Sequence, residues 1–154
     1  SWAVALAFAA ALLAVAPAHA QLTVEITRGV SRPIPIAIVP FGVTQGPVPV
    51  DVAAVIEADL ERSGRFDGLE RAAMLQKPTS GAEVDFANWR LLKTDFVVVG
   101  RLAPQGADWA IQYELFNVLT GERLLGFSVP AAPNALRLGA HRVADMIYEK
   151  ILGV

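Results

Sequence analysis

The sequence predicts an α/β domain in which a mixed β-sheet is packed with helices. Two short apolar runs, at residues 34–39 and 96–102, have the length and the branched residues typical of buried strands. Two amphipathic segments, at 52–62 and 136–151, repeat apolar residues at helical spacing. Because strands and helices alternate before a final meander and helix, we expect one layered domain.

The first strand is expected at residues 34–39, where Pro40 ends the apolar run. Residues 42–49 are rich in Gly and Pro and are predicted to form a loop. Asp51 is a suitable N-cap for a helix that ends near Arg62, before Gly64. One face of this helix is apolar, formed by Val52, Val55, Ile56 and Leu60.

The middle of the chain is predicted to hold a short strand at 66–69, a loop at 77–81 and a short helix capped by Asp85. The strand at 96–102 follows. Its almost unbroken β-branched composition is typical of a central strand that is covered on both faces.

The last third is predicted to be a β-hairpin followed by a helix. Residues 109–116 alternate in polarity, Thr120-Gly121 forms a turn, and residues 123–129 return as the partner strand. Asn134 is the expected N-cap of the final helix. The apolar residues expected in the core are Trp109, Ile111, Tyr113 and Leu115 on the hairpin, and Leu136, Ala140, Val143, Ile147 and Ile151 on the helix.

Residues 1–20 have the pattern of a secretory signal peptide. They are uncharged and apolar, and Ala18-His19-Ala20 supplies the small residues that a signal peptidase reads, so cleavage is expected between Ala20 and Gln21. Because no basic start or initiator Met precedes the run, we expect this leader to be clipped at its front. A membrane anchor is the alternative, but Pro17 shortens a run already below the roughly 20 residues that a bilayer needs. The mature protein, 21–154, is therefore expected to be exported with no membrane span.

The composition excludes several classes of protein. With no Cys, the exported domain depends on packing instead of disulfides, and it lacks the lipid-accepting Cys of an anchored lipoprotein. The formal net charge is −2 and the isoelectric point about 5.6, which gives no electrostatic reason to bind nucleic acid.

Few residues are suited to catalysis. A Ser-His-acid triad after the leader would have to use His141, which falls on the polar part of the final helix and is expected to be solvated or structural. Trp109 and Tyr113 have the spacing of core residues, and no phosphate-binding loop or cofactor motif occurs. We therefore expect an interaction module, not an enzyme, with no cofactor and no metal. No His supports the acidic residues on the first helix as metal ligands, and these are expected to form its cap and wet face: Asp51, Glu57, Asp59 and Glu61.

Four segments together resemble the amino-terminal domain of the TolB family: GVSRPIPIAIVPF, IEADLERSGRFDGLER, FANWRLLKTDFVVVGRL and HRVADMIYEKILGV. The resemblance covers essentially all of residues 21–154. It implies a periplasmic component of the Tol–Pal system, which supports outer-membrane integrity and envelope constriction during cell division. It also implies a fold similar to the anticodon-binding domains of tRNA synthetases. The family's β-propeller, which binds the lipoprotein Pal, would begin where this chain stops, so no Pal-binding residue is assigned here.

In the family, the first mature residues bind the carboxy-terminal domain of TolA. The resemblance places that contact on Gln21, Leu22, Thr23, Val24, Glu25, Ile26, Thr27, Arg28, Gly29, Val30 and Ser31. The residue pattern agrees with this role, because Leu22, Val24 and Ile26 form one apolar edge of an extended segment whose backbone can pair with a partner's sheet. An ordinary first strand of the domain's own sheet is the alternative, and one segment could serve as both.

Two other functions compete with this interpretation. A periplasmic domain that activates peptidoglycan synthases, or assembles secretion machinery, shares the P-F and S-G-x-F pattern. Such domains are commonly lipid-anchored, and this chain has no Cys to carry an anchor. RNA binding, suggested by the anticodon-binding fold, conflicts with export and with the acidic balance, and similarity of fold alone does not establish function.

Overall fold

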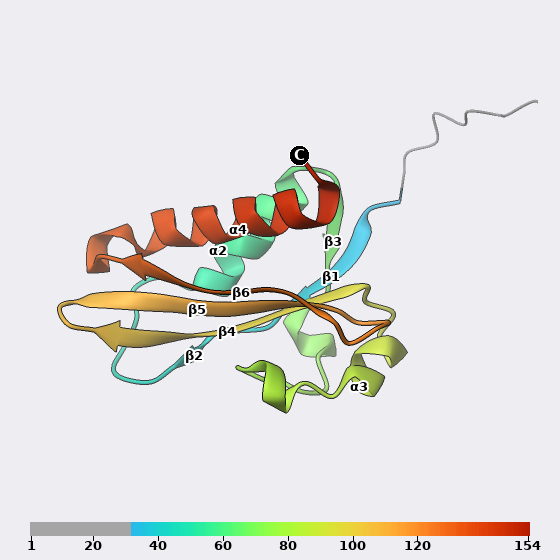
Figure 1. Cartoon of the computed structure of the whole chain (residues 1–154), viewed down its shortest axis with the longest axis horizontal. Helices are drawn as coiled ribbons and strands as arrows, with labels where there is room; N and C mark the ends of the chain where they lie inside the picture. Colours follow the sequence, from blue (N-terminus) through green and yellow to red (C-terminus); the bar gives the residue numbers. More distant parts are fainter. Residues whose placement is uncertain (1–31) are drawn as a thin grey trace, which may run out of the picture. The chain divides into compact units, whose positions relative to one another are not determined.

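A mixed sheet of six strands forms the centre of the domain in the computed structural model, which describes residues 32–154 (Figure 1). The strand order is β3-β1-β4-β5-β6, and β2 pairs with β4 beyond the end of β1. The predicted mixed α/β sheet is thus confirmed. The strands are β1 (Ile34–Ile38), β2 (Gly42–Val43), β3 (Phe66–Gly68), β4 (Phe96–Gln105), β5 (Asp108–Asn117) and β6 (Arg123–Ala131).

The sheet has a parallel half and an antiparallel half. β1 lies between β3 and β4 and runs parallel to both, with Ile36 opposite Gly68 on one side and Phe96 on the other. β4, β5 and β6 form an antiparallel meander. The predicted loop at 42–49 was wrong at its first two residues, because the chain after Pro40 stays beside β4 and pairs with it as β2.

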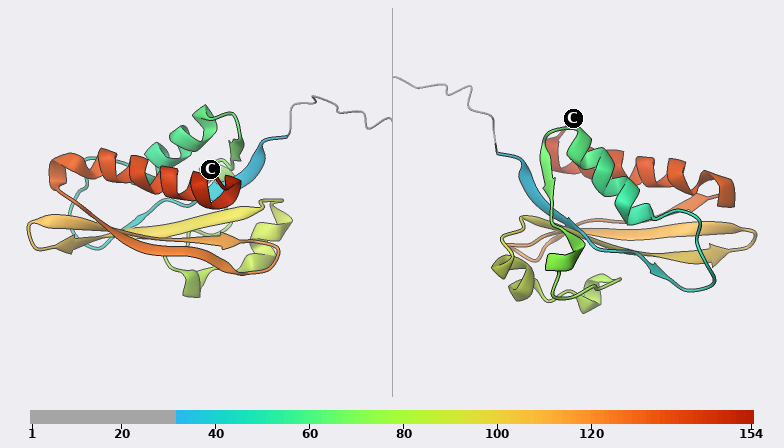
Figure 2. Two further views of the ribbon diagram at one scale, coloured as in Figure 1. Left: turned by 45° about the horizontal axis from the view of Figure 1, so that its top comes forward. Right: turned by 180° about the vertical axis from the view of Figure 1, so that it is seen from behind.

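Two helices cover one face of the sheet (Figures 1 and 2). They are α2 (Val52–Arg62) and α4 (Leu136–Leu152). Apolar residues from both helices and from five strands form one core cluster, as the helical spacing predicted. Gly139 allows the close approach of α4, because a Cβ there would lie 2.6 Å from Cδ1 of Ile111. Core residues of this face include Ile38, Ile56, Val98, Ile111, Leu115, Leu136 and Ile147.

The second face is covered over only part of its area. The short helix α3 (Phe86–Leu91) and two 3-10 turns lie below the parallel half, where Trp89 is 1% exposed against Ala37, Val97 and Val99 (Figure 1). Arg101, two residues further along β4, is exposed. The prediction that residues 96–102 are covered on both faces therefore holds only to Val99 on this side.

The helix ends follow local capping rules with one exception. Asp51 accepts the Ala54 N–H and Asp85 accepts the Ala87 N–H, as predicted, and Gly64 has a positive φ of 74° just after α2. The predicted cap at Asn134 was wrong. Residues 133–135 form a 3-10 turn, so α4 begins at Leu136 without a side-chain cap.

Among residues 32–154, no helix combines the length and the apolar composition that a membrane-spanning helix needs. The predicted signal peptide at 1–20 and the predicted first strand around residues 22–27 lie outside the described residues.

Candidate partner-binding site

The predicted contact for TolA, residues 21–31, and the predicted cleavage site after Ala20 also lie outside the described residues. The described chain begins just after them, with Arg32 and Pro33, and enters β1 at Ile34. The Ile34 N–H bonds the Arg65 carbonyl at 2.8 Å, and β1 is paired along both edges. The strand that follows the predicted segment is therefore an interior strand of the sheet, between β3 and β4.

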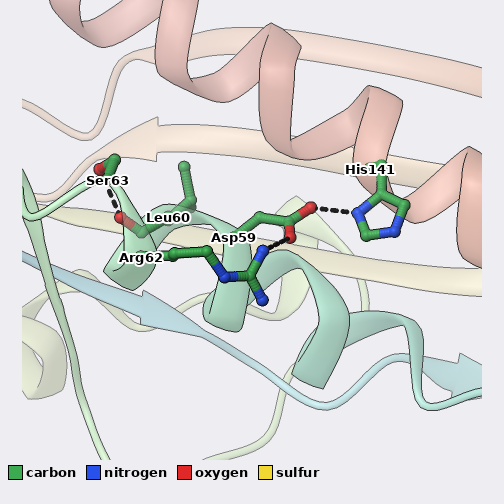
Figure 3. A network of polar contacts seen from close by, with 5 residues as sticks. All are labelled: Asp59, Leu60, Arg62, Ser63 and His141. Atoms are coloured by element: carbon green, nitrogen blue, oxygen red, sulfur yellow. Dashed lines mark hydrogen bonds and ion pairs between the residues drawn. The ribbon is translucent and has the colours of Figure 1, made fainter.

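His141, the predicted structural or solvated histidine, is part of a contact between the two large helices (Figure 3). Its Nδ1 contacts one carboxylate oxygen of Asp59, on α2. Arg62 donates to the other oxygen of Asp59 at 3.0 Å. Asp59 was predicted to lie on the wet face of its helix, which was wrong, because α4 packs against that part of α2 and leaves the side chain 18% exposed.

The Asp59–His141 pair lacks a nucleophile in the described part of the chain. The nearby Ser63 hydroxyl donates to the Leu60 carbonyl at 2.6 Å and so satisfies the end of its own helix (Figure 3). No bond within residues 32–154 joins a hydroxyl to His141. Since a triad needs a hydroxyl within hydrogen-bond reach of the imidazole, the geometry fits a link between helices.

The other acidic residues of α2 have separate structural contacts. Arg71 donates two hydrogen bonds of 2.8 Å to Asp51, and these bonds lower the pKa of the Asp51 carboxyl. Burial, and then the neighbouring Glu61, raises the pKa of Glu57. Glu61 accepts the Gly68 N–H at 3.2 Å. Within residues 32–154, no three acidic, His or Cys side chains gather as metal ligands.

A polar hollow on the uncovered part of the sheet was not predicted. Arg101 donates to Gln112 at 2.7 Å, and Arg123 approaches Glu114 at 3.5 Å. Glu114 also accepts the Gly81 N–H at 2.8 Å, which fixes the loop before α3 to the sheet. The alternating polar residues of β5 were the available signal, but the sequence does not show that this side of the strand stays open.

A sequence profile of the TolB amino-terminal domain matches residues 22–124. The chain belongs to the TolB family. It is 46% identical over 141 residues to the Tol-Pal system protein TolB of Thioalkalivibrio sulfidiphilus, covering 89% of this chain and 32% of that protein. It is 47% identical over 156 residues to the Tol-Pal system protein TolB of Xanthomonas campestris pv. campestris, covering 97% and 35%. The chain thus spans about a third of the length of these curated relatives.

Solved structures agree with this family. The crystal structure of TolB from Acinetobacter baumannii superposes with a TM-score of 0.68 at 26% identity, over 79% of this chain and 29% of that one. The LpoB carboxy-terminal domain from Salmonella enterica superposes with a TM-score of 0.52 at 12% identity, over 66% and 83%. At that identity LpoB shares the fold alone. The resemblance drawn from the four sequence segments is confirmed.

Proposed function

We propose that this domain is a periplasmic protein-interaction module of the Tol–Pal system, and that residues 21–31 contact the carboxy-terminal domain of TolA. The observation that carries the proposal is the family match, which begins at Leu22 and so includes almost the whole segment. The relatives carry the name Tol-Pal system protein TolB, which supports membership of that system. We further propose that the module supports outer-membrane integrity and envelope constriction, and that Pal binds through a β-propeller outside this chain.

The segment has the composition for pairing with a partner's sheet. Leu22, Val24 and Ile26 alternate with polar residues, so an extended backbone presents them on one side. Full burial of such side chains is worth roughly 1.5–3 kcal/mol each. Ordering a flexible backbone costs about 1–2 kcal/mol per residue. The free energy of side-chain burial and the cost of ordering the backbone nearly offset. The remaining binding free energy must therefore come from backbone hydrogen bonds, and we expect a dissociation constant on the order of micromolar.

We expect that a partner can bind residues 21–31 while the sheet of the domain stays folded. β1 is bonded on both edges to β3 and β4, and residues within 32–154 form a core cluster on each face of the sheet. Removing residues 21–26 therefore takes away no described core side chain. We therefore expect the domain to fold without them, so that the deletion tests binding.

The test is calorimetric titration of the TolA carboxy-terminal domain with the mature chain and a set of variants. Deletion of residues 21–26 should abolish binding while circular dichroism still reports a folded domain. Val24→Thr, which keeps side-chain shape, should weaken binding, and its matched control Thr23→Val on the opposite side should not. Thr23→Pro should weaken binding if the Thr23 N–H faces the partner. Binding of the deleted chain at parent affinity would refute the contact.

Export is tested separately. Amino-terminal sequencing of protein recovered from the periplasm should give Gln21 as the first residue, because Ala18 and Ala20 present small side chains to the peptidase. Recovery of material that still carries residues before Gln21 would contradict cleavage at this site. In cells, the deletion of 21–26 should cause leakage of periplasmic proteins and delayed constriction at normal protein abundance.

A further inference from the structure

β6 is the long edge of the sheet. Its inner side pairs with β5 over nearly its whole length, and no strand within residues 32–154 pairs with its outer side (Figure 1). The opposite edge strand, β3, has only 3 residues, whereas β6 has 9. A long unpaired edge presents a row of backbone donors and acceptors to any extended chain that fits beside it.

The hairpin between β4 and β5 shows which groups of β6 point outward. Its two-residue loop starts at Gly106, with φ of 62°, and is flanked by Gln105 opposite Asp108. Residues flanking such a loop form a hydrogen-bonded pair, so Asp108 and the other even-numbered residues of β5 bond β4. The odd-numbered residues of β5 therefore bond β6. On β6, the outward groups therefore belong to the residues between those bonded pairs: Gly126, Ser128 and Pro130. Pro130 lacks an N–H and loses nothing at an outward position.

The side chains beside this edge are unusual for an unpaired strand. Phe127 is 51% exposed, and with Leu125 and Met146 it lines an apolar groove between β6 and the end of α4. No charged residue occurs from Leu124 to Ala131, although edge strands are commonly protected by charged residues. On the opposite face of β6, Gly126 and Ser128 are small. The Arg123 guanidinium lies over Gly126, where it pairs with Glu114 of its own chain at 3.5 Å.

We propose that β6 pairs antiparallel with β6 of a second copy of this chain, about a two-fold axis at Phe127. In this register Leu125 faces the partner's Val129, Gly126 faces the partner's Ser128, and the two Phe127 side chains meet. Gly126 and the partner's Ser128 exchange N–H···O bonds, since both point outward. Arg123 falls opposite the partner's Ala131, and its guanidinium, which lies over Gly126, is paired with Glu114 of its own chain.

Self-pairing fits this edge better than pairing with a strongly charged strand. Each copy contributes one acid and one base, Glu149 and Lys150, beside the groove, so the joined grooves carry no net charge from these residues. Stable complexes bury about 1,200–2,000 Å² in total, whereas this contact is limited to one strand of 9 residues and its groove. The dimer should therefore be weak and depend on concentration.

The first test is sedimentation equilibrium of the chain from micromolar to millimolar concentration. The average mass should rise toward that of a dimer. Phe127→Lys places two charges at the axis, and Ser128→Pro removes an outward donor without touching the β5 bonds. Each should weaken association at least about tenfold. Leu91→Lys, on α3 and 74% exposed, is the matched control and should dimerise like the parent.

The second test fixes the register, using the absence of Cys in the chain. In Phe127→Cys, the two thiols should lie within disulfide distance across a non-hydrogen-bonded pair, and oxidation should give a covalent dimer. Leu91→Cys should stay mostly monomeric under the same oxidation. Circular dichroism checks the fold of every variant. If the average mass is that of one chain at every concentration, the proposal is wrong, and β6 is open to a strand of another protein. If the dimer forms in both Phe127→Lys and Ser128→Pro, the proposal is also wrong.

Discussion

The contact between Asp51 and Arg71 joins the start of α2 to the 3-10 turn at Arg71–Ala73, and two substitutions separate its parts. Asp51→Asn keeps an oxygen that caps Ala54 but removes the carboxylate that binds Arg71. Because the two side chains are 51% and 37% exposed, we expect a loss of only about 0.5 kcal/mol in the free energy of unfolding. Asp51→Ala also removes the cap, worth about 1 kcal/mol, so its total loss should be about 1.5 kcal/mol.

The pH dependence distinguishes the charge from the cap. Hydrogen bonds from Arg71 lower the folded-state pKa of Asp51 below its unfolded value of about 3.9. The stability that the carboxylate contributes is thus present above that value and is lost as the pH falls through the folded-state pKa. Urea unfolding should show a constant difference between parent and Asp51→Asn from about pH 5 to about pH 7, shrinking towards about pH 2. A difference that persists unchanged at low pH, or an Asn variant as unstable as Ala, would refute the reasoning.

Three further predictions concern the core and the contact between the helices. Gly139→Ala should gain about 1 kcal/mol in helix propensity but lose about 1–3 kcal/mol through overpacking against Ile111, so a thermal melt should show net destabilisation, not a gain. Burial raises the pKa of Tyr113 to about 12. In Tyr148→Phe, where Tyr113 is the one remaining tyrosine, the phenol should therefore ionise near that pH, and the free energy of unfolding should fall as the pH rises above about 10. Ionisation of Tyr113 near about pH 10 in a folded chain would contradict its burial. His141→Gln should lower stability by less than about 1 kcal/mol and leave envelope function intact at normal abundance; lost function in a folded protein would reveal a missed site.

The strands and helices were predictable where one residue pattern determines both local structure and burial. Ile36 and Ile38 face α2 and α4, whereas Ala37 faces α3. The continuous apolar run at 34–39 therefore indicates a strand that is covered on both faces. Asp51 and Asp85 were predictable caps because each side chain bonds a backbone N–H two or three residues further along the same segment. Such contacts depend on sequence neighbours alone.

Contacts between distant segments were not predictable in the same way. Asp59 and His141 are 82 residues apart, and their pairing depends on how α2 and α4 cross the sheet. Arg101 ends the covered part of β4 only because α3 is short and lies under the parallel half. The pairing of Gly42–Val43 likewise needs β4 beside it, since two residues carry no strand pattern of their own. The predicted partner segment at 21–31 lies outside the described residues and remains a prediction.

The two strand-type contacts proposed for this chain can be separated by exchanging their variants. Residues 21–31 would donate a strand to a partner's sheet, whereas β6 would accept one, and β1 is closed on both edges, so neither contact uses β1 as its edge. Ser128→Pro should therefore retain parent affinity for the TolA carboxy-terminal domain, and the chain without residues 21–26 should retain the dimer. If Ser128→Pro abolished TolA binding and the deletion had no effect on it, β6 would be the surface that receives TolA. If the deletion abolished the dimer, the second copy would be held through the amino-terminal segment, and the register centred on Phe127 would be wrong.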